Sequence, residues 1–526
     1  MEAARWPERR WSRFLAPLFC CAGALAAHCG FSGTTGGSSS GTGGGSGSAV
    51  PGSGSVVNPG SGSAPSSGAS TGGVPLTFKN YELTGTWPQL KAAIASKAST
   101  SAAWKTAGAP APFMRKVIKG GAPPNTLSYA ESCSIADYNE DGIPDVSAGR
   151  RWYEGPDFTK EHIFRGGHDG LPVTGDPAEL VTGVTDDWAC YPFDVNGDGH
   201  TDIINIASCD ADTTVSPAPK PQAKGTGYWY QNPGPGGLAG DPMWAPHLMH
   251  SDMKQEQKGL FDVNGDGKPE IYGACHNCPP GSTKGYFEAD WANPTAGWTY
   301  HPVTTYYQFP FGGTGWLHGL GAGDVNGDGK PDLLEAHGIW IQPTAPGGMW
   351  MHNTTELTDI ANDPVGNHGG SHMFAFDVNG DGATDIVSAD WAHGYGIAWY
   401  EQSKTAAGTF TKHYIANQTM PPVFSEPHAM QFIDMDGDGL SDIVVGKERY
   451  AHPRGYGDPD LEGTPVLYVF KLIRDPAAPG GARFEPHLVD SEFGVGRQVT
   501  VGHVNMDGIP DICVSTKIGL AVFFGQ

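Results

Sequence analysis

From residue 113 to the end of the chain, apolar residues occur in short runs bounded by Gly, Pro, Asn and Asp. Runs such as 202–206 (Asp-Ile-Ile-Asn-Ile) and 442–445 (Asp-Ile-Val-Val) are rich in β-branched residues, which is typical of β-strands. Two such runs flank each of a series of acidic loops, and an aromatic run and a run ending in His follow them. The pattern predicts a repeat of four strands.

The third and fourth strands of this predicted repeat are marked by aromatic residues. We expect the Trp and Tyr side chains to form the core between repeats, and the histidines to be packing or solvent-facing residues of the outermost strand. Aromatic runs begin at Trp152, Trp229, Trp340, Trp399 and Tyr468, and the aromatic–His pairs are Trp244/His247, Trp298/His301, Phe410/His413 and Phe484/His487.

The acidic loops follow the pattern Asp-x-Asn/Asp-x-Asp-Gly-x-x-Asp. Side-chain oxygens at positions 1, 3, 5 and 9, with the carbonyl of position 7, suit a hard cation such as Ca²⁺, and Gly at position 6 permits the sharp turn. The sequence therefore predicts up to seven calcium sites. The seven loops begin at Asp137, Asp194, Asp262, Asp324, Asp377, Asp434 and His503, at intervals of 53 to 69 residues.

Two loops depart from the pattern. His503 replaces the first Asp of the seventh loop, so a weak or empty site is expected there, and Glu270 replaces the last Asp of the third. The predicted ligands are Asp137, Asn139, Asp141, Ile143 and Asp145; Asp194, Asn196, Asp198, His200 and Asp202; Asp262, Asn264, Asp266, Lys268 and Glu270; Asp324, Asn326, Asp328, Lys330 and Asp332; Asp377, Asn379, Asp381, Ala383 and Asp385; Asp434, Asp436, Asp438, Leu440 and Asp442; and Asn505, Asp507, Ile509 and Asp511.

An EF-hand is the competing interpretation of these loops. It requires Glu at position 12 and a helix on each side. Only the fourth loop has Glu there (Glu335), and the flanking runs have strand character. A strand–loop–strand hairpin is therefore favoured.

The two ends of the repeat region complement each other. No aromatic–His strand follows the seventh loop, and a spare strand candidate, residues 113–118, precedes the first. If this N-terminal strand completes the last repeat, the ring closes and no sheet edge is left exposed. The predicted fold is all-β: a seven-bladed β-propeller of four-stranded antiparallel blades, closed by the N-terminal strand.

These loops resemble those of the FG-GAP/VCBS-repeat propellers, whose best-known members are the integrin α-subunit heads. The resemblance covers about residues 113–526 and implies that each loop joins the first two strands of a blade and binds Ca²⁺, with all loops on one side of the ring. More distantly, the chain resembles the propeller domains of sugar lyases and dehydratases, such as rhamnogalacturonan lyases and aldos-2-ulose dehydratase.

The opposite rim of such a ring gathers ionisable residues. His318, His372 and His428 come from consecutive repeats, so their imidazoles are expected to converge and either bind a transition metal or act as acid–base groups. The alternative is that they hydrogen-bond to backbone at the channel mouth. Candidate groups for substrate hydroxyls are Glu256, Lys447 and Arg497, and His393 lies close by in register.

Two functions remain open at this stage. The first is a surface-tethered module that binds a carbohydrate or protein ligand at this rim. The second is a sugar-active enzyme of the polysaccharide lyase or dehydratase type, with a His-rich and metal-dependent site in the axial funnel. The sequence contains no nucleophile elbow or zinc-protease helix.

The first 111 residues predict export. Residues 1–29 have the form of a secretory signal, with an apolar run too short to span a membrane, and Cys29 resembles the lipidated residue of bacterial lipoproteins. Residues 30–72 predict a Gly/Ser-rich flexible tether, 73–111 a short irregular or helical lead-in, and 112–526 the propeller. The expected product is a monomer that is either secreted or an outer-membrane, cell-surface lipoprotein.

Composition limits the partners. The formal net charge of −24 argues against nucleic acid, and the acidic loops account for much of it. A membrane contact is expected only through a lipid anchor at Cys29. Cys275 and Cys278 have the spacing of a loop disulfide or of half a zinc site, and the disulfide is favoured because no second pair follows.

Overall fold

The computed structural model describes residues 81–82, 113–120, 130–166, 187–206, 226–253, 256–275, 278, 283–303, 318–345, 347–357, 369–451 and 458–526. They all belong to one compact unit, residues 54–526. The predicted signal, the tether and nearly all of the lead-in lie outside the described residues. Within the part of the chain that the structure describes, no helix has the length and apolar character needed to cross a membrane.

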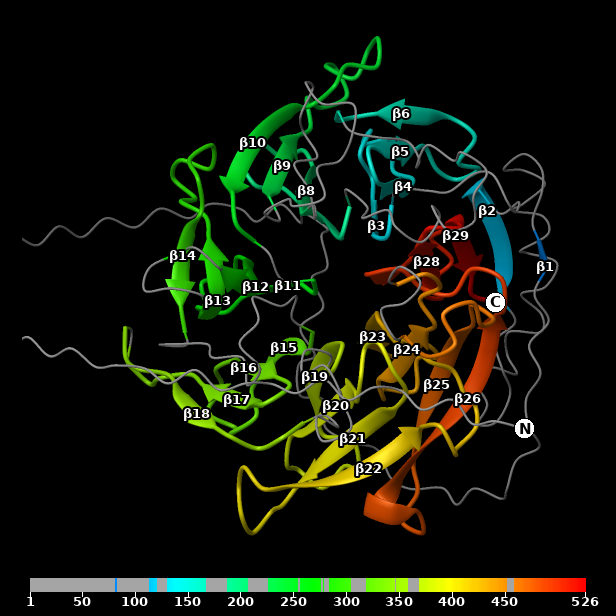
Figure 1. Ribbon diagram of the computed structural model, residues 1–526. Coiled ribbons are helices and arrows are strands. Elements are labelled where there is room, and N and C mark those ends of the chain that lie inside the picture. Colours follow the sequence, from blue (N-terminus) through cyan, green and yellow to red (C-terminus); the bar gives the residue numbers. More distant parts are fainter. Residues whose placement is uncertain are drawn as a thin grey trace, which may run out of the picture. The chain divides into compact units, whose positions relative to one another are not determined.

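Four sheets have four strands each (Figure 1). They consist of β3 (Cys133–Ala136), β4 (Asp145–Ala148), β5 (Arg151–Tyr153) and β6 (Glu161–Ile163); β7 (Ala189–Phe193), β8 (Asp202–Ile206), β9 (Gly227–Gln231) and β10 (Ala245–His250); β11 (Gly259–Phe261), β12 (Glu270–Cys275), β13 (Thr283–Glu288) and β14 (Thr299–Pro302); and β23 (Met430–Ile433), β24 (Asp442–Gly446), β25 (Leu467–Arg474) and β26 (Ala482–Asp490), with the short 3-10 helix η4 (Pro479–Gly481) before β26.

Two sheets are larger. An eight-stranded sheet divides into two antiparallel four-stranded units joined by the parallel pair β15–β19, and a five-stranded sheet contains both the first and the last strands. The former consists of β15 (Leu320–Gly323), β16 (Asp332–Glu335), β17 (Gly338–Ile341), β18 (Met351–Asn353), β19 (His372–Phe376), β20 (Asp385–Ala389), β21 (Ile397–Gln402) and β22 (Phe410–Ala416), and the latter of β1 (Tyr81–Glu82), β2 (Met114–Gly120), β27 (Val499–Gly502), β28 (Asp511–Ser515) and β29 (Gly519–Phe524).

The inner strands of successive sheets lie side by side. Strand β3 contacts β7 on one side and β27 on the other, and β23 contacts β19 and β27. The fold is therefore all-β, with four-stranded antiparallel blades in a β-propeller arrangement, as the strand pattern predicted. Hydrogen bonds group the strands into six sheets because β15 and β19 pair across the boundary between two four-stranded units.

The N-terminal strand completes the last sheet. Strand β2 pairs with β29 in antiparallel register, from Met114 opposite Phe524 to Gly120 opposite Gly519. Arg115 also forms an ion pair with Asp490 of the preceding sheet, at 2.8 Å. The predicted closure by residues 113–118 is thus confirmed.

Each Asp-rich loop joins the first two strands of a four-stranded unit. Its ninth residue is the first residue of the second strand, as with Asp145 of β4 and Asp202 of β8. Strands rather than helices flank the loops, so the preference for a strand hairpin over an EF-hand was correct. The second strand is then buried along its whole length, as in β8, β20 and β24.

The core lies between adjacent sheets. Trp229 and Met249 of one sheet pack against Ile271 and Phe287 of the next. The histidines of the outermost strands stack on the aromatic residues of the third strands, with ring centroids 4.2 Å apart for His247 and Trp229 and 4.5 Å for His413 and Trp399. These residues are packing elements, as the sequence predicted.

The close pairing of β15 with β19 requires glycine at Gly321. A Cβ atom there would lie 1.9 Å from the carbonyl oxygen of Met373. We expect Gly321→Ala to destabilise the fold by about 1–3 kcal/mol because it forces the two strands apart. Urea unfolding measures the change. Gly236→Ala, whose new Cβ meets nothing within 4 Å, is the matched control, and equal stability of the two variants would contradict this expectation.

Candidate functional site

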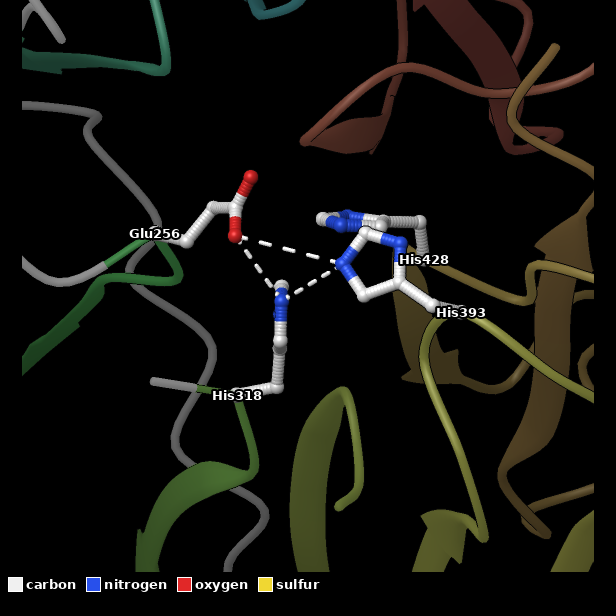
Figure 2. A group of neighbouring side chains, drawn as sticks. All are labelled: Glu256, His318, His393 and His428. Atoms are coloured by element: carbon white, nitrogen blue, oxygen red, sulfur yellow. Dashed lines mark hydrogen bonds and ion pairs between the residues drawn. The ribbon is translucent and has the colours of Figure 1, made fainter. Parts of the chain in front are cut away.

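Three histidines and one glutamate converge from four separate segments (Figure 2). Glu256, His318 and His428 lie just before the inner strands β11, β15 and β23, and His393 lies in the connection between β20 and β21. Each residue offers one ligand atom, and these atoms all lie within 4.8 Å of one another. All four residues are buried, and His428 has no exposed surface. We refer to them as the axial cluster.

The axial cluster is compact enough for its side chains to share one bound ion. His318 Nε2 lies 2.8 Å from Glu256 Oε2 and 2.8 Å from His393 Nε2. The ring centroids of the three histidines are 4.6 to 4.8 Å apart, and their planes are nearly perpendicular to one another. Three imidazoles and a carboxylate in this arrangement form the donor set that Zn²⁺, Fe²⁺ and Mn²⁺ accept.

Outer carboxylates face the other nitrogens of two of these rings. His428 Nδ1 lies 3.2 Å from Glu448, and His393 Nδ1 lies 3.7 Å from Asp458. A proton on Nδ1 of each ring would leave its Nε2 lone pair for a metal ion. The guanidinium of Arg497, which can only donate, lies 3.4 Å from His428 Nε2, so a metal ion would have to displace it to use that lone pair.

Arg497 links the axial cluster to further charges. Its guanidinium pairs with Glu256, lies 3.3 Å from Glu448 and packs over the Trp188 ring at 5.1 Å. Glu131 lies 3.8 Å from the same guanidinium and 3.1 Å from Lys517. The side chains of this network are almost fully buried, so its charges are poorly screened by solvent.

The network carries more negative than positive groups. Four carboxyl groups (Glu131, Glu256, Glu448 and Asp458) stand against two cations (Arg497 and Lys517). Burial, together with repulsion from Glu131, raises the pKa of Glu448 well above its usual range. Uncompensated buried charge is costly, and a divalent cation would stabilise the ionised form of these carboxyl groups.

The structure brings together four of the six residues that the sequence singled out at this rim: Glu256, His318, His428 and Arg497. His372 does not join them. Its Nδ1 accepts a hydrogen bond from the amide of Met430 at 3.4 Å, its other nitrogen bonds to the backbone of Lys258, and burial lowers its pKa to about 4. His372 therefore takes the backbone-bonding role that was the alternative for these histidines.

Lys447 also lies apart from the axial cluster. Its ammonium donates to Ser425 Oγ at 2.6 Å and pairs with Glu426 at 3.2 Å. Burial raises the pKa of Glu426 to about 8, although Lys447 lowers it. Lys447 is therefore engaged by its own partners, and His393 supplies the third imidazole that was expected from His372.

The Asp-rich loops place their predicted oxygen ligands around the turn. In the second loop, Asp194 accepts hydrogen bonds from the amides of Gly197, Asp198 and Gly199 at 2.8 to 3.1 Å. The ninth residue, Asp202, accepts a hydrogen bond from the amide of Val195 in the loop and another from the amide of Asn232, directly after the third strand. Oxygen-rich loops of this kind are the ones that hard cations prefer.

The carboxylates at position 9 are the most buried of these loop residues. Burial raises the pKa of Asp145, Asp202 and Asp385 to about 7 and that of Glu270 to about 8. A group of this kind favours a nearby cation that stabilises its charged form. In the third loop, Glu270 lies within 4.8 Å of Asp266 and of Glu288 from β13.

Cys275 and Cys278 form a disulfide. The sequence favoured this pairing over half a zinc site, and the structure confirms it.

Comparison with known families agrees with the loop pattern. Residues 262–335 and 348–445 match the FG-GAP-like repeat family. These two segments are FG-GAP-like repeats. They include the third to sixth Asp-rich loops and the three histidines of the axial cluster, His318, His393 and His428. No curated protein matches the chain in sequence.

Several solved structures are similar to this chain. An Agrocybe aegerita lectin that recognises non-reducing terminal N-acetylglucosamine is 17% identical over 70% of this chain and 82% of its own, with a TM-score of 0.40. Rhamnogalacturonan lyase YesW is 11% identical over 78% and 76% (TM-score 0.37), and the Bacillus licheniformis rhamnogalacturonan lyase is 12% identical over 77% and 73% (TM-score 0.35). These likenesses are too weak to assign a function.

Proposed function

We propose that the axial cluster binds one divalent transition metal ion and that the protein uses this centre to bind and convert a carbohydrate. The observation that carries the proposal is the approach of the ligand atoms of His318, His393, His428 and Glu256 to within 4.8 Å of one another, in a buried network in which carboxyl groups outnumber cations. Structural calcium in the Asp-rich loops is a separate part of the proposal.

The residues around the metal have distinct roles in this proposal. Glu448 and Asp458 orient the imidazoles of His428 and His393 through their Nδ1 atoms. Arg497 holds Glu256 in place and excludes water from one side of the cluster by packing on Trp188. Such second contacts are needed to keep a metal centre rigid. A bound metal of this class supplies Lewis acidity toward a hydroxyl or carbonyl oxygen.

A carbohydrate is the proposed ligand because the axis offers many groups that bind hydroxyls. Glu131, Arg497 and Lys517 lie next to the axial cluster with side chains at most 4% exposed, so the hydroxyls of a ligand would reach them by replacing their present ion pairs. Sites built from such groups recognise ligands with several hydroxyls, whereas an apolar ligand would leave them unpaired.

A binding module without catalysis is the second candidate. The axial cluster is almost fully enclosed, with side chains at most 4% exposed. Such burial favours a structural metal that stiffens the ring while a carbohydrate or protein ligand binds at the rim.

The number of blades, the loop calcium ions, export and the monomeric state are also part of the proposal. Seven Asp-rich loops, the two four-stranded units of the eight-stranded sheet and the completion of the last sheet by β2 support seven blades. Calcium in the loops, export through residues 1–29, anchoring at Cys29 and a monomeric state are proposed on the sequence alone.

Metal analysis tests the axial centre. We expect the full chain, after dialysis against a mild chelator, to retain about one Zn, Fe or Mn per chain by plasma mass spectrometry. His393→Ala and His428→Ala are expected to retain less than about a tenth of that metal because each removes one of four ligands. His247→Ala, which removes an outer-strand histidine, is the control and should keep the full amount.

The outcomes separate the two candidates. Calcium alone in the wild type would overturn the axial metal. If the metal is present, an ultraviolet screen for unsaturated sugar products and a glycan array, each with His393→Ala alongside, distinguish conversion from binding. Products that depend on His393 support the enzyme, and glycan binding that His393→Ala leaves unchanged supports the module.

A further inference from the structure

The sixth Asp-rich loop differs from all the others at one ligand position. Position 3 is Asn in six loops and Asp436 in this one, so the sixth loop alone has four carboxylates at positions 1, 3, 5 and 9. An additional acidic residue increases the charge repulsion in an already acidic turn. A compensating feature is therefore expected nearby.

Lys471 is that feature. Its ammonium contacts Asp436 and lies 3.3 Å from Asp438. The lysine side chain is 12% exposed and that of Asp436 is 1% exposed, so the contact is shielded from solvent. The next residue, Leu472, donates its amide to Asp442 at 2.9 Å, which fixes the backbone of β25 against the loop.

The equivalent strand position in other blades holds no cation. The residues that precede the matching amide donors are Glu154, Gln231 and Glu401. Gln231 donates to Asp198 of the second loop at 3.3 Å, and Glu401 accepts from Asn379 of the fifth loop at 3.5 Å. This strand position thus faces the loop in the second and fifth blades, and in the sixth blade it delivers a positive charge.

The seventh loop closes in a related way. His503 stands where the other loops have their first Asp, and its Nδ1 lies 3.2 Å from the carbonyl oxygen of Ile509. That carbonyl is at position 7, which is a ligand position in the pattern. A side chain of the loop therefore occupies a ligand oxygen that the other loops offer to an ion.

We propose that Lys471 takes the place of the metal ion in the sixth loop, that His503 closes the seventh without one, and that the chain binds five calcium ions instead of seven. A divalent ion on Asp436 and Asp438 would lie within a few ångström of the ammonium and be repelled by it. Sheets β23–β26 and β27–β29, which border His428 and Arg497, then keep their loops closed when calcium is absent.

Calcium counting tests this directly, and independently of the axial metal, which is a different element. Equilibrium dialysis of the full chain at saturating Ca²⁺ should give five ions per chain. Lys471→Met, which keeps the length and removes the charge, should give six, and so should the double variant Asp436→Asn with Lys471→Glu, which reproduces the fifth loop. His503→Asp should also give six.

Lys404→Met is the matched control. Lys404 lies 3.7 Å from Asp381 of the fifth loop, but its side chain is 54% exposed, so its loss should leave the count at five. Six or seven ions in the wild type, or no gain in both Lys471 variants, would overturn the proposal.

Amide exchange gives a second measurement on the wild type alone. After chelation, amides of residues 434–442 and 503–511 should keep their protection, while those of 194–202 and 324–332 should exchange at least ten times faster. Equal loss of protection in all four loops would also overturn the proposal.

Discussion

Chelation of calcium is expected to lower the thermal midpoint of this protein by roughly 15–25 °C. At a free concentration about a hundred times the dissociation constant, each independent site adds about 2.7 kcal/mol, so five sites add roughly 13 kcal/mol. A typical domain has only about 5–15 kcal/mol of stability in total. Without the ions, the clustered carboxylates of each loop repel one another at the start of a buried strand.

Circular dichroism melts with and without EDTA, followed by addition of excess Ca²⁺, measure this effect. The midpoint should recover when calcium is restored. Asp194→Ala in the second loop should lower the midpoint measured in calcium. Asp434→Ala in the sixth loop should not change the number of bound calcium ions, because Lys471 already neutralises that loop. A midpoint that EDTA shifts by less than a few degrees would show that the loops contribute little through metal binding.

The repeat pattern was sufficient to predict most of the fold. Short runs rich in β-branched residues on either side of each Asp-rich loop placed the first two strands, and the unmatched strand at residues 113–118 predicted the pairing of β2 with β29. These features depend on local sequence and on the need to cover a sheet edge, so they can be inferred without knowing the rest of the structure.

The axial cluster was only partly predictable, because it depends on where a connecting turn docks. His393 reaches His428 because the amide of Glu426 donates to the carbonyl of Gly394 at 2.6 Å, which holds the turn after β20 against the segment before β23. Gly396, at a φ of 118°, allows that turn to return to the strand. Register along the strands suggested His372 instead, and no local sequence pattern shows that its ring forms hydrogen bonds with the backbone.

Charge pairs between sheets were likewise not predictable. Glu335 entered the sequence argument only as position 12 of the fourth loop, and Lys284 did not enter it. In the structure they lie on β16 and β13 of neighbouring sheets, with 2.6 Å between Nζ and Oε2. Such a contact is specified by packing and not by spacing along the chain.

This pair provides the second large expected effect. Lys284→Met should destabilise the protein by about 3–5 kcal/mol because it leaves the carboxylate of Glu335 buried and uncompensated. The two side chains are 1% and 2% exposed, and Glu335 also accepts a hydrogen bond from Trp340 Nε1 at 2.9 Å. Urea unfolding at saturating calcium measures the loss.

Two variants control for the change in packing. The double variant Lys284→Met with Glu335→Met should recover most of the stability, because two apolar residues leave no buried charge. Lys258→Met removes another buried lysine, one whose ammonium packs over Trp188 at 5.6 Å, and it should leave stability unchanged or raise it. Equal losses in Lys284→Met and Lys258→Met would contradict a specific role for the pair.

The pH dependence of the pair has a definite sign. Burial raises the pKa of Glu335, but the attraction of Lys284, together with hydrogen bonds from His352 and Trp340, outweighs it and brings the pKa to about 2. An unfolded Glu titrates near pH 4.3, so the folded state holds the proton less tightly. The stability due to the pair is therefore complete above about pH 4.3 and is lost as the pH falls toward 2. The difference in unfolding free energy between the wild type and the double Met variant should follow that course, and a difference that stays constant from pH 5 to 2 would mean that Glu335 is not charged in the folded protein.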